Sequence, residues 1–279
     1  MHRPVELRAF LDRLGIRPKK SLSQNFLIDK NILDKILILA DVKEGDLVVE
    51  VGPGPGALTE QLLAKGAKVI AIEKDAVYAK ELERFDGNLK VYCEDVLEVD
   101  WNAILDGLPK AKVVANLPYH ITTPILTALA PKNALFTSLT VMVQDEVAKR
   151  FTGKPGTKDF GSITVYLEYF SKIQYGFKIS PNSFYPPPKV HSAIVHFQLE
   201  KRFPVKDEEA FFQMVRSTFE ARRKMVTTTL KKRFSVEAIE KALKSAGCRL
   251  QARPEDISLE QWVTIYKYLL DPDCSRNKM

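Results

Sequence analysis

Short apolar segments alternate with amphipathic helical patterns between residues 47 and 143. The apolar segments are LVVEV (47–51), AKVIAIE (67–73), LKVYC (89–93), KVVAN (112–116) and SLTVMV (138–143). Between them lie segments such as ALTEQLLAKG (57–66) and DAVYAKELERF (75–85), whose apolar residues recur at helical spacing. This alternation predicts an α/β fold, with a parallel sheet and helices on both of its faces.

The pattern changes twice after residue 160. Two period-2 segments, SKIQYGFKIS (171–180) and HSAIVHFQLE (191–200), predict an antiparallel pair that closes one edge of the sheet. From about residue 207 onward the pattern is helical, and Ser235 and Ser258 stand where helix N-caps are expected. We therefore expect a domain of residues 1–203, with an N-terminal arm of residues 1–30, and a small all-helical C-terminal domain of residues 204–279.

Composition narrows the class of protein. The 279 residues carry a net charge of +7, and the three cysteines and four histidines show no metal-ligand spacing, which favours a reduced cytoplasm and no metal. The longest apolar runs are far shorter than the ~20 residues that a bilayer needs, so no membrane span is expected. The arm holds 7 basic against 3 acidic residues, residues 31–200 hold 18 against 21, and residues 201–279 hold 17 against 11. This distribution indicates a small-molecule site in the middle and a polyanion bound by the flanks, although solvated surface lysines are an equal alternative.

A glycine-rich loop follows the first predicted strand, in VVEVGPGPGALT (48–59). Gly52, Gly54 and Ala57 satisfy the dinucleotide pattern G-x-G-x-x-G/A, so the glycines alone do not distinguish NAD from other adenosine ligands. Pro53 and Pro55, however, remove two backbone N–H donors that a pyrophosphate would need. S-adenosyl-L-methionine, a cationic adenosine derivative without phosphate, loses nothing by their absence.

Two acidic residues follow the next strands. Glu73 ends the second strand, 21 residues after Gly52, where a carboxylate can accept hydrogen bonds from both ribose hydroxyls. Asp95 follows the third strand and is placed to meet the adenine amino group. For each of them, a helix N-cap or a solvated loop position is the structural alternative.

The fourth strand leads into NLPY, Asn116 to Tyr119. Acceptors for both N6 hydrogens of an adenine would direct the nitrogen lone pair at the sulfonium methyl group, and the Asn116 side-chain oxygen and the Leu117 carbonyl can serve as such acceptors. Pro118 would stiffen the turn and Tyr119 would stack on the base. Phe184, in FYPPPKV (184–190), could cover the other face of an extruded adenine; a hydrophobic plug at a strand end is the alternative.

The tail contains two basic clusters. Along a continuous helix, the cations would lie on one side and line a phosphate path, with Phe219, Val226 and Leu230 facing the core. The expected RNA-binding residues are Arg222, Arg223, Lys224, Lys231, Lys232 and Arg233.

These segments together resemble the ribosomal RNA adenine N6,N6-dimethyltransferases. The resemblance covers about residues 18–200 and rests on QNFLID (24–29), EVGPGPGALT (50–59), IEKD (72–75), EDVL (94–97), NLPY (116–119) and FYPPPKV (184–190), in that order. The tail segment FEARRKMVTTTL (219–230) resembles the bacterial small-subunit enzyme more than the erythromycin-resistance methylases.

The resemblance implies a Rossmann-like class I methyltransferase sheet and dimethylation of two adjacent adenosines in the 3′-terminal hairpin loop of small-subunit (16S) rRNA during ribosome assembly. S-adenosyl-L-homocysteine would be the product, the small ribosomal subunit the partner, and the enzyme a monomer. Asn25 and Leu27 would cover the cofactor with backbone contacts, Gly52 would border its methionine moiety, and Asn116 would lie between cofactor and target.

Three alternatives remain open at this point. The same chemistry could act on large-subunit rRNA or on DNA, although DNA adenine methylases usually carry Asp-Pro-Pro-Tyr in place of Asn-Leu-Pro-Tyr. The protein could serve mainly as a non-catalytic ribosome-assembly factor that binds the cofactor. An NAD oxidoreductase is disfavoured by the two prolines and by the lack of an evident proton donor.

Overall fold

The computed structural model describes residues 4–17 and 24–270, and residues 1–3 and 18–23 of the expected arm lie outside the described residues. The described chain forms two compact units. The first comprises the residues up to Ala148 together with Lys172–Leu199, and the second comprises Lys149–Ser171 together with the residues from Glu200 onward.

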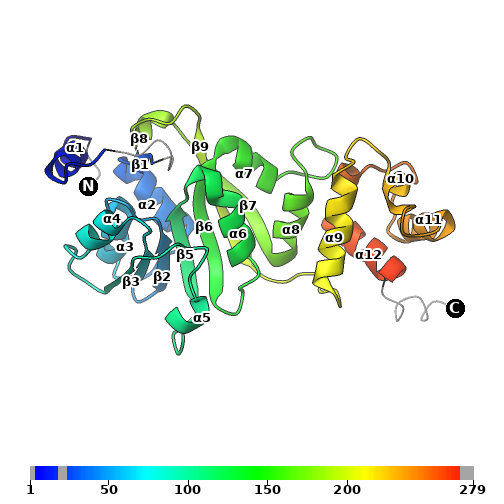
Figure 1. Ribbon diagram of the computed structural model, residues 1–279, viewed down its shortest axis with the longest axis horizontal. Helices are drawn as coiled ribbons and strands as arrows, with labels where there is room; N and C mark the ends of the chain where they lie inside the picture. Colours follow the sequence, from blue (N-terminus) through cyan, green and yellow to red (C-terminus); the bar gives the residue numbers. More distant parts are fainter. Residues whose placement is uncertain (1–3, 18–23, 271–279) are drawn as a thin grey trace. The chain divides into compact units, whose positions relative to one another are not determined.

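The first unit is built on a seven-stranded sheet with the order β4-β3-β2-β5-β6-β9-β7 (Figure 1). Its strands are β2 (Leu47–Val51), β3 (Lys68–Ile72), β4 (Leu89–Tyr92), β5 (Ala111–Asn116), β6 (Phe136–Gln144), β7 (Ser171–Ile179) and β9 (Ser192–Leu199). Strands β2 to β6 pair in parallel, β9 pairs antiparallel with β6, and β7 forms the edge beside β9. The predicted α/β sheet and its antiparallel edge are confirmed.

Helices connect the parallel strands and cover the sheet. They are α2 (Lys30–Leu39), α3 (Ala57–Ala64), α4 (Ala76–Leu82), α5 (Trp101–Ile104), α6 (Thr122–Leu129) and α7 (Asp145–Phe151), with the 3-10 turns η2 (Tyr119–Ile121) and η3 (Pro181–Ser183). Side chains of α2 and α3 join one face of the sheet in a common core, in which Leu33, Leu62 and Val114 are at most 1% exposed. Every residue of β2 is buried, as is typical of a strand in the middle of a covered parallel sheet.

Two short elements from distant parts of the chain form a second, two-stranded sheet. Strand β1 (Phe26–Leu27) pairs antiparallel with β8 (Phe184–Tyr185), which joins the QNFLID and FYPPPKV motifs. Helix α1 (Pro4–Arg13) packs nearby and buries Leu7, Phe10 and Leu11 against Tyr78 of α4. The described part of the expected arm therefore belongs to the first unit.

The second unit is helical. It contains α8 (Ser162–Phe170), α9 (Glu208–Phe219), α10 (Val226–Leu230), α11 (Val236–Ser245), η4 (Pro254–Asp256) and α12 (Leu259–Leu270). Ser235 caps α11 by accepting a hydrogen bond from the N–H of Ala238, and Ser258 stands before α12, where its hydroxyl accepts one from the N–H of Gln261. Both serines thus lie at the expected helix starts.

The division of the chain differs from the expected cut after residue 203. Residues 149–171, from the middle of the chain, pack with the tail, because aromatic rings of α8 lie against those of α9. Tyr166 and Phe212 have ring centroids 4.7 Å apart, and those of Tyr169 and Phe211 are 5.6 Å apart. Tyr169 also donates a hydrogen bond to Glu208. Burial of these rings stabilises the second unit by drawing in a segment that precedes β7.

Candidate active site

The carboxyl ends of the parallel strands meet at one edge of the sheet and border a cleft of about 350 Å³. Each of β2, β3, β4 and β5 contributes residues from the turn that follows it, as expected of ligand sites in open α/β sheets. The structure brings together here most of the predicted site residues: Asn25, Gly52, Glu73, Asp95, Asn116, Leu117, Pro118 and Tyr119. Leu27 and Phe184 do not line this cleft.

The backbone N–H groups of the glycine loop, residues 52–56, already have hydrogen-bond acceptors within the protein. All three glycines have positive φ angles, from 54° to 84°, which residues with a Cβ rarely adopt. Their N–H groups all donate within the protein, and the two prolines have none. The donor–acceptor pairs are Gly52 N to Ile72 O (2.9 Å), Gly54 N to Glu73 Oε2 (2.9 Å) and Gly56 N to Pro53 O (3.0 Å). Residues 52–56 therefore offer no free amide to a pyrophosphate.

Glu73 is held in place by the backbone around it. The side chain is 8% exposed, and its two oxygens accept hydrogen bonds from Gly54 N and from Asp75 N, at 2.9 and 2.8 Å. Burial raises the pKa of the carboxyl group, while these backbone donors act in the opposite direction. The carboxylate thus connects the end of β3 to the glycine loop and fixes one side of the cleft.

Asp95 is more open than Glu73 and pairs with a cation. Its Oδ2 lies 2.7 Å from Lys74 Nζ, and its Oδ1 accepts a hydrogen bond from Leu97 N at 3.0 Å. The hydrogen bond from Lys74, followed by that from Leu97, lowers the pKa of Asp95. Asp95 therefore lines the cleft, as predicted, and also makes the local backbone contact that was the structural alternative.

The charges around the cleft indicate the kind of ligand that it can hold. Among the described residues that line it, four bear carboxyl groups, Glu73, Asp75, Glu94 and Asp95, against Lys74 and His120. An excess of acidic groups favours a cationic ligand, and the closed glycine loop disfavours phosphate. The residues present therefore fit S-adenosylmethionine, which carries a sulfonium and no phosphate, better than NAD. Among the described residues, no cluster of His, Cys, Asp and Glu side chains could hold a metal ion.

The NLPY segment lies where β5 leaves the sheet. Asn116 Nδ2 donates a hydrogen bond to the carbonyl oxygen of Asn25 at 3.1 Å, which leaves Asn116 Oδ1 as an acceptor. The Tyr119 hydroxyl lies 2.7 Å from Ser192 Oγ, and burial raises the pKa of Tyr119. Asn116 and Tyr119 are thus each held through their polar ends, Asn116 by the residue that precedes β1 and Tyr119 by the first residue of β9.

Phe184 lies in the hydrophobic core in this structure. Its side chain is 2% exposed and belongs to the same core cluster as Leu27, its partner in the β1–β8 pair. The observed conformation corresponds to the hydrophobic plug at a strand end, which was the alternative to an aromatic lid. The Leu27 side chain is likewise buried, so a cofactor contact by this residue would have to come from its backbone.

Three further residues contact the site or lie beside it, and no sequence pattern identified them as site residues. Arg84 donates from Nη2 to the carbonyl oxygen of Pro55 at 2.5 Å, and its guanidinium carbon lies 4.9 Å from the centroid of the Phe10 ring. Ser192 holds Tyr119, and Glu50 is buried beneath the glycine loop. Only the position of Glu50, next to the glycine motif, could have drawn attention to it.

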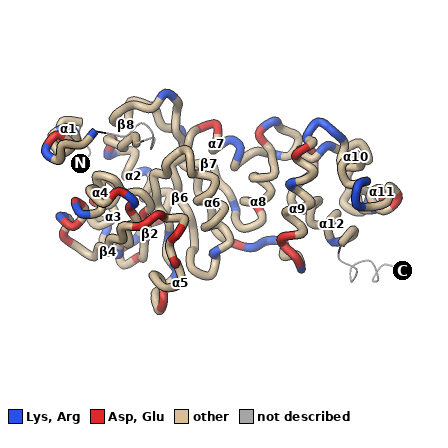
Figure 2. Tube along the Cα trace, in the orientation of Figure 1, with Lys and Arg blue, Asp and Glu red and all other residues tan. Residues whose placement is uncertain are grey.

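The second unit carries a separate basic pocket of about 540 Å³. Its cationic lining residues are Lys158, Arg222, Arg223, Arg249 and Arg253. Arg222 is tied down, since its Nη2 donates to Thr157 O at 3.2 Å and its Nε lies 3.6 Å from Glu255 Oε2. Figure 2 shows Lys and Arg residues gathered around the turn between α9 and α10.

The expectation of a continuous basic helix in the tail is wrong. Helix α9 ends at Phe219, α10 begins at Val226, and the residues between them form turns. No single helix therefore aligns the cations at 222–224 with those at 231–233. Val226 and Leu230 are buried as expected, whereas Phe219 is only partly buried. Only Arg222 and Arg223 of the six predicted cations line the basic pocket.

The fold and the cleft define a methyltransferase of the Rossmann-like, S-adenosylmethionine-dependent class. The model of the ribosomal RNA adenine dimethylase family matches residues 15–271, and this chain belongs to that family. Ribosomal RNA small subunit methyltransferase A of Protochlamydia amoebophila (strain UWE25) is 50% identical over 276 residues, which cover 96% of this chain and 97% of the relative. The protein of the same name from Chlamydia trachomatis serovar L2 is 44% identical over 271 residues, which cover 95% and 97%.

Solved structures agree with this assignment. A dimethyladenosine transferase from Plasmodium falciparum superposes with a TM-score of 0.71 at 25% identity, covering 86% of this chain and 95% of that one. The 23S rRNA methyltransferase ErmE superposes with a TM-score of 0.69 at 26% identity, covering 88% and 99%. No helix in the described ranges has the length and apolarity needed to cross a bilayer.

Proposed function

We propose that this protein transfers methyl groups from S-adenosylmethionine to N6 of two adjacent adenosines in the 3′-terminal hairpin loop of small-subunit rRNA, during ribosome assembly. It would act in the cytoplasm as a monomer. The observation that carries the proposal is the joint position of Glu73, Asp95 and Asn116 around one acidic cleft, in a chain whose relatives are named small subunit methyltransferases.

The cofactor supplies an electrophilic methyl group, and the protein must supply orientation. Asn116 Oδ1 and the Leu117 carbonyl would accept hydrogen bonds from the two N6 hydrogens, which directs the nitrogen lone pair away from the ring plane. Tyr119, held by Ser192, would stack on the adenine. Because the methylated ammonium is acidic, its proton can leave to water without a strong general base.

The basic pocket of the second unit supports an RNA substrate. Its described lining residues include five cations against two acidic residues, Glu255 and Asp256, and such an excess of positive charge favours a phosphate backbone. A hairpin loop is also the part of an RNA from which an adenine is extruded at lowest cost. Lys158, Arg249 and Arg253 thereby join Arg222 and Arg223 as proposed RNA-binding residues.

The test is methyl transfer from labelled S-adenosylmethionine to small ribosomal subunits from cells that lack the enzyme. The wild type is compared with Asn116→Ala and, as a matched control, with Asn102→Ala, which changes an exposed asparagine on α5. Nuclease digestion and mass spectrometry then map the product. We expect dimethyladenosine in the 3′-terminal hairpin with the wild type and the control, and none with Asn116→Ala.

Other outcomes would redirect the proposal. Label found in large-subunit RNA would instead assign to the chain the activity for which its structural relative ErmE, a 23S rRNA methyltransferase, is named. Cofactor binding without label in any ribosomal RNA, together with subunit maturation that needs the protein but not Asn116, would favour an assembly factor. Tighter binding of NAD than of S-adenosylmethionine would contradict the cofactor assignment.

A further inference from the structure

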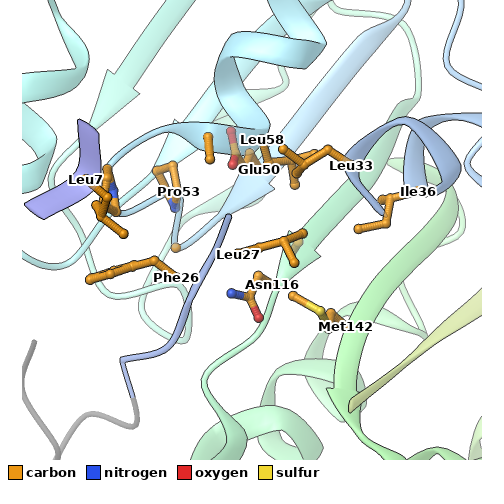
Figure 3. Close-up of a pocket in the computed structure, with 14 residues that line it drawn as sticks. Leu7, Phe26, Leu27, Leu33, Ile36, Glu50, Pro53, Leu58, Asn116 and Met142 are labelled. Carbon is orange, nitrogen blue, oxygen red and sulfur yellow. The ribbon is translucent and has the colours of Figure 1, made fainter. Parts of the chain in front are cut away.

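A carboxyl group lies buried behind the glycine loop, outside the cleft described above. Glu50 is the fourth residue of β2 and is 1% exposed. Its side chain lines a small cavity of about 40 Å³, with apolar neighbours such as Leu33 and Leu58 (Figure 3). Gly52 and Asn116 line both this cavity and the cleft, so the two spaces share a wall.

Burial favours the neutral form of the Glu50 carboxyl group, against hydrogen bonds from Thr59 that favour the carboxylate. Thr59, which is 0% exposed in the first turn of α3, donates a hydrogen bond from Oγ1 to Glu50 Oε2 at 2.7 Å. The titratable group that acts on it most strongly is Glu73, which is itself acidic, and none of the described residues that line the cavity is cationic. Burial is the largest cause that raises the pKa of Glu50, to about 8, and the negative charge of Glu73 adds to it.

A buried carboxyl group in this position responds to charge on the other side of the wall. A positive charge in the cleft attracts a carboxylate through a medium of low dielectric constant, where the interaction is much stronger than in water. The cavity is large enough for a water molecule that could solvate the ionised form. The N-terminal turn of α3 also favours a negative charge beside it.

We propose that Glu50 is a proton-linked anchor for the cationic cofactor, protonated in the free protein and ionised in the complex. On binding, the carboxyl O–H bond breaks, the proton leaves to solvent, and the carboxylate remains behind the glycine loop. This inference rests on the methyl donor and not on the RNA substrate. It would therefore survive a change of RNA target.

The experiment is isothermal titration calorimetry of S-adenosylmethionine into the full-length protein at pH 7, in buffers of different ionisation enthalpy. The dependence of the heat on the buffer gives the number of protons released. A carboxyl group with a pKa near 8 that ionises completely on binding releases about 0.9 proton at this pH. We expect Glu50→Gln to release fewer protons than the wild type by about that amount.

Two controls separate this effect from other titrations. Glu73 also has a raised pKa, so the difference between the wild type and Glu50→Gln, rather than the total release, measures Glu50. Glu168→Gln removes another partly buried carboxyl group with a raised pKa, in the second unit, and should leave the release unchanged. Equal proton release by the wild type and Glu50→Gln would overturn the proposal.

Affinity provides a second readout that does not depend on the folding of the Glu50 variant. If binding ionises Glu50, the wild-type Kd falls by up to about tenfold per pH unit between pH 6 and 8. Thr59→Val removes a donor that stabilises the carboxylate, and should raise Kd more at pH 6, where the free protein holds the proton, than at pH 8, where part of the free protein is already ionised. A wild-type Kd that is constant from pH 6 to 8 would refute the linkage.

Discussion

Gly56 offers the sharpest test of how the glycine loop is built. It precedes α3 with φ 84° and ψ 25°, in the left-handed region. A Cβ at this position would lie 2.4 Å from Phe85 Cε2 and 2.9 Å from Leu82 Cδ2. Leu82 is a buried residue of α4, and Phe85, in the turn after it, is partly buried. Gly56→Ala therefore combines an unfavourable backbone conformation with a steric clash.

The two contributions can be estimated separately. The left-handed conformation costs about 1 kcal/mol for a residue with a Cβ. Forcing a methyl group into a packed site costs typically ~1–3 kcal/mol. Gly45 has nearly the same φ, 81°, but a Cβ there would meet nothing within 4 Å. Gly45→Ala should thus show the backbone cost alone, and Gly56→Ala should exceed it by about 1–3 kcal/mol.

The clash should also reach the cofactor site. The Arg84 guanidinium carbon lies 4.2 Å from the centroid of the Phe85 ring, and Arg84 donates to Pro55 O in the glycine loop. A ring displaced by the new methyl group would disturb this contact. We expect weaker S-adenosylmethionine binding by calorimetry for Gly56→Ala and not for Gly45→Ala, alongside the difference in urea unfolding. Equal unfolding free energies for the two variants would refute the reasoning.

Three further predictions concern the tail, the N-terminal helix and pH. Arg223→Ala with Lys224→Ala should weaken rRNA binding and make its salt dependence shallower, by about one unit of log–log slope per lost phosphate contact, while S-adenosylmethionine affinity stays constant; an unchanged salt series contradicts this. Phe10→Ala should weaken cofactor binding measured by calorimetry, because the ring supports Arg84; unchanged affinity would separate α1 from the site. The folded state alone keeps the Glu50 proton between the ordinary pKa of 4.5 and about 8, so the free energy of unfolding should fall as pH rises through that window. The contribution of Glu50 to this fall is at most ~1.4 kcal/mol per pH unit, and urea unfolding of Glu50→Gln should give a pH profile that is shallower by that contribution; parallel pH profiles contradict it.

The sheet was predictable because its signals are local. Each parallel strand appears as an apolar run of its own, and the turn after each run falls at the carboxyl edge in any sheet of this kind. Glu73, Asp95 and Asn116 could therefore be assigned to one cleft without knowledge of the contacts between them. Their partners could not, because the Asn25 carbonyl lies 91 residues away from Asn116 along the chain.

The helical tail was predicted less well because its structure depends on packing. The segment between Phe219 and Val226 contains no proline or glycine, so its sequence does not indicate a break. In the structure, Val226 N donates to Ala252 O at 2.9 Å, and this contact with a distant turn ties down the start of α10. Residues 149–171 join the second unit for a similar reason, through aromatic contacts that neither segment reveals alone.

The sequence shows which residues of the glycine loop lack an N–H donor, but not whether the remaining donors are free to bind a ligand. Pro53 and Pro55 remove two amides, which disfavours a phosphate, but three glycine amides would suffice to bind one if they were free. The structure directs those three amides to Ile72, Glu73 and Pro53. Glu73 can accept from Gly54 only because β3 lies beside β2 in register, with Val51 opposite Ile72. The lack of free amides in this loop therefore arises from sheet register together with the prolines, and a change that freed the Gly54 amide should weaken the discrimination against phosphate.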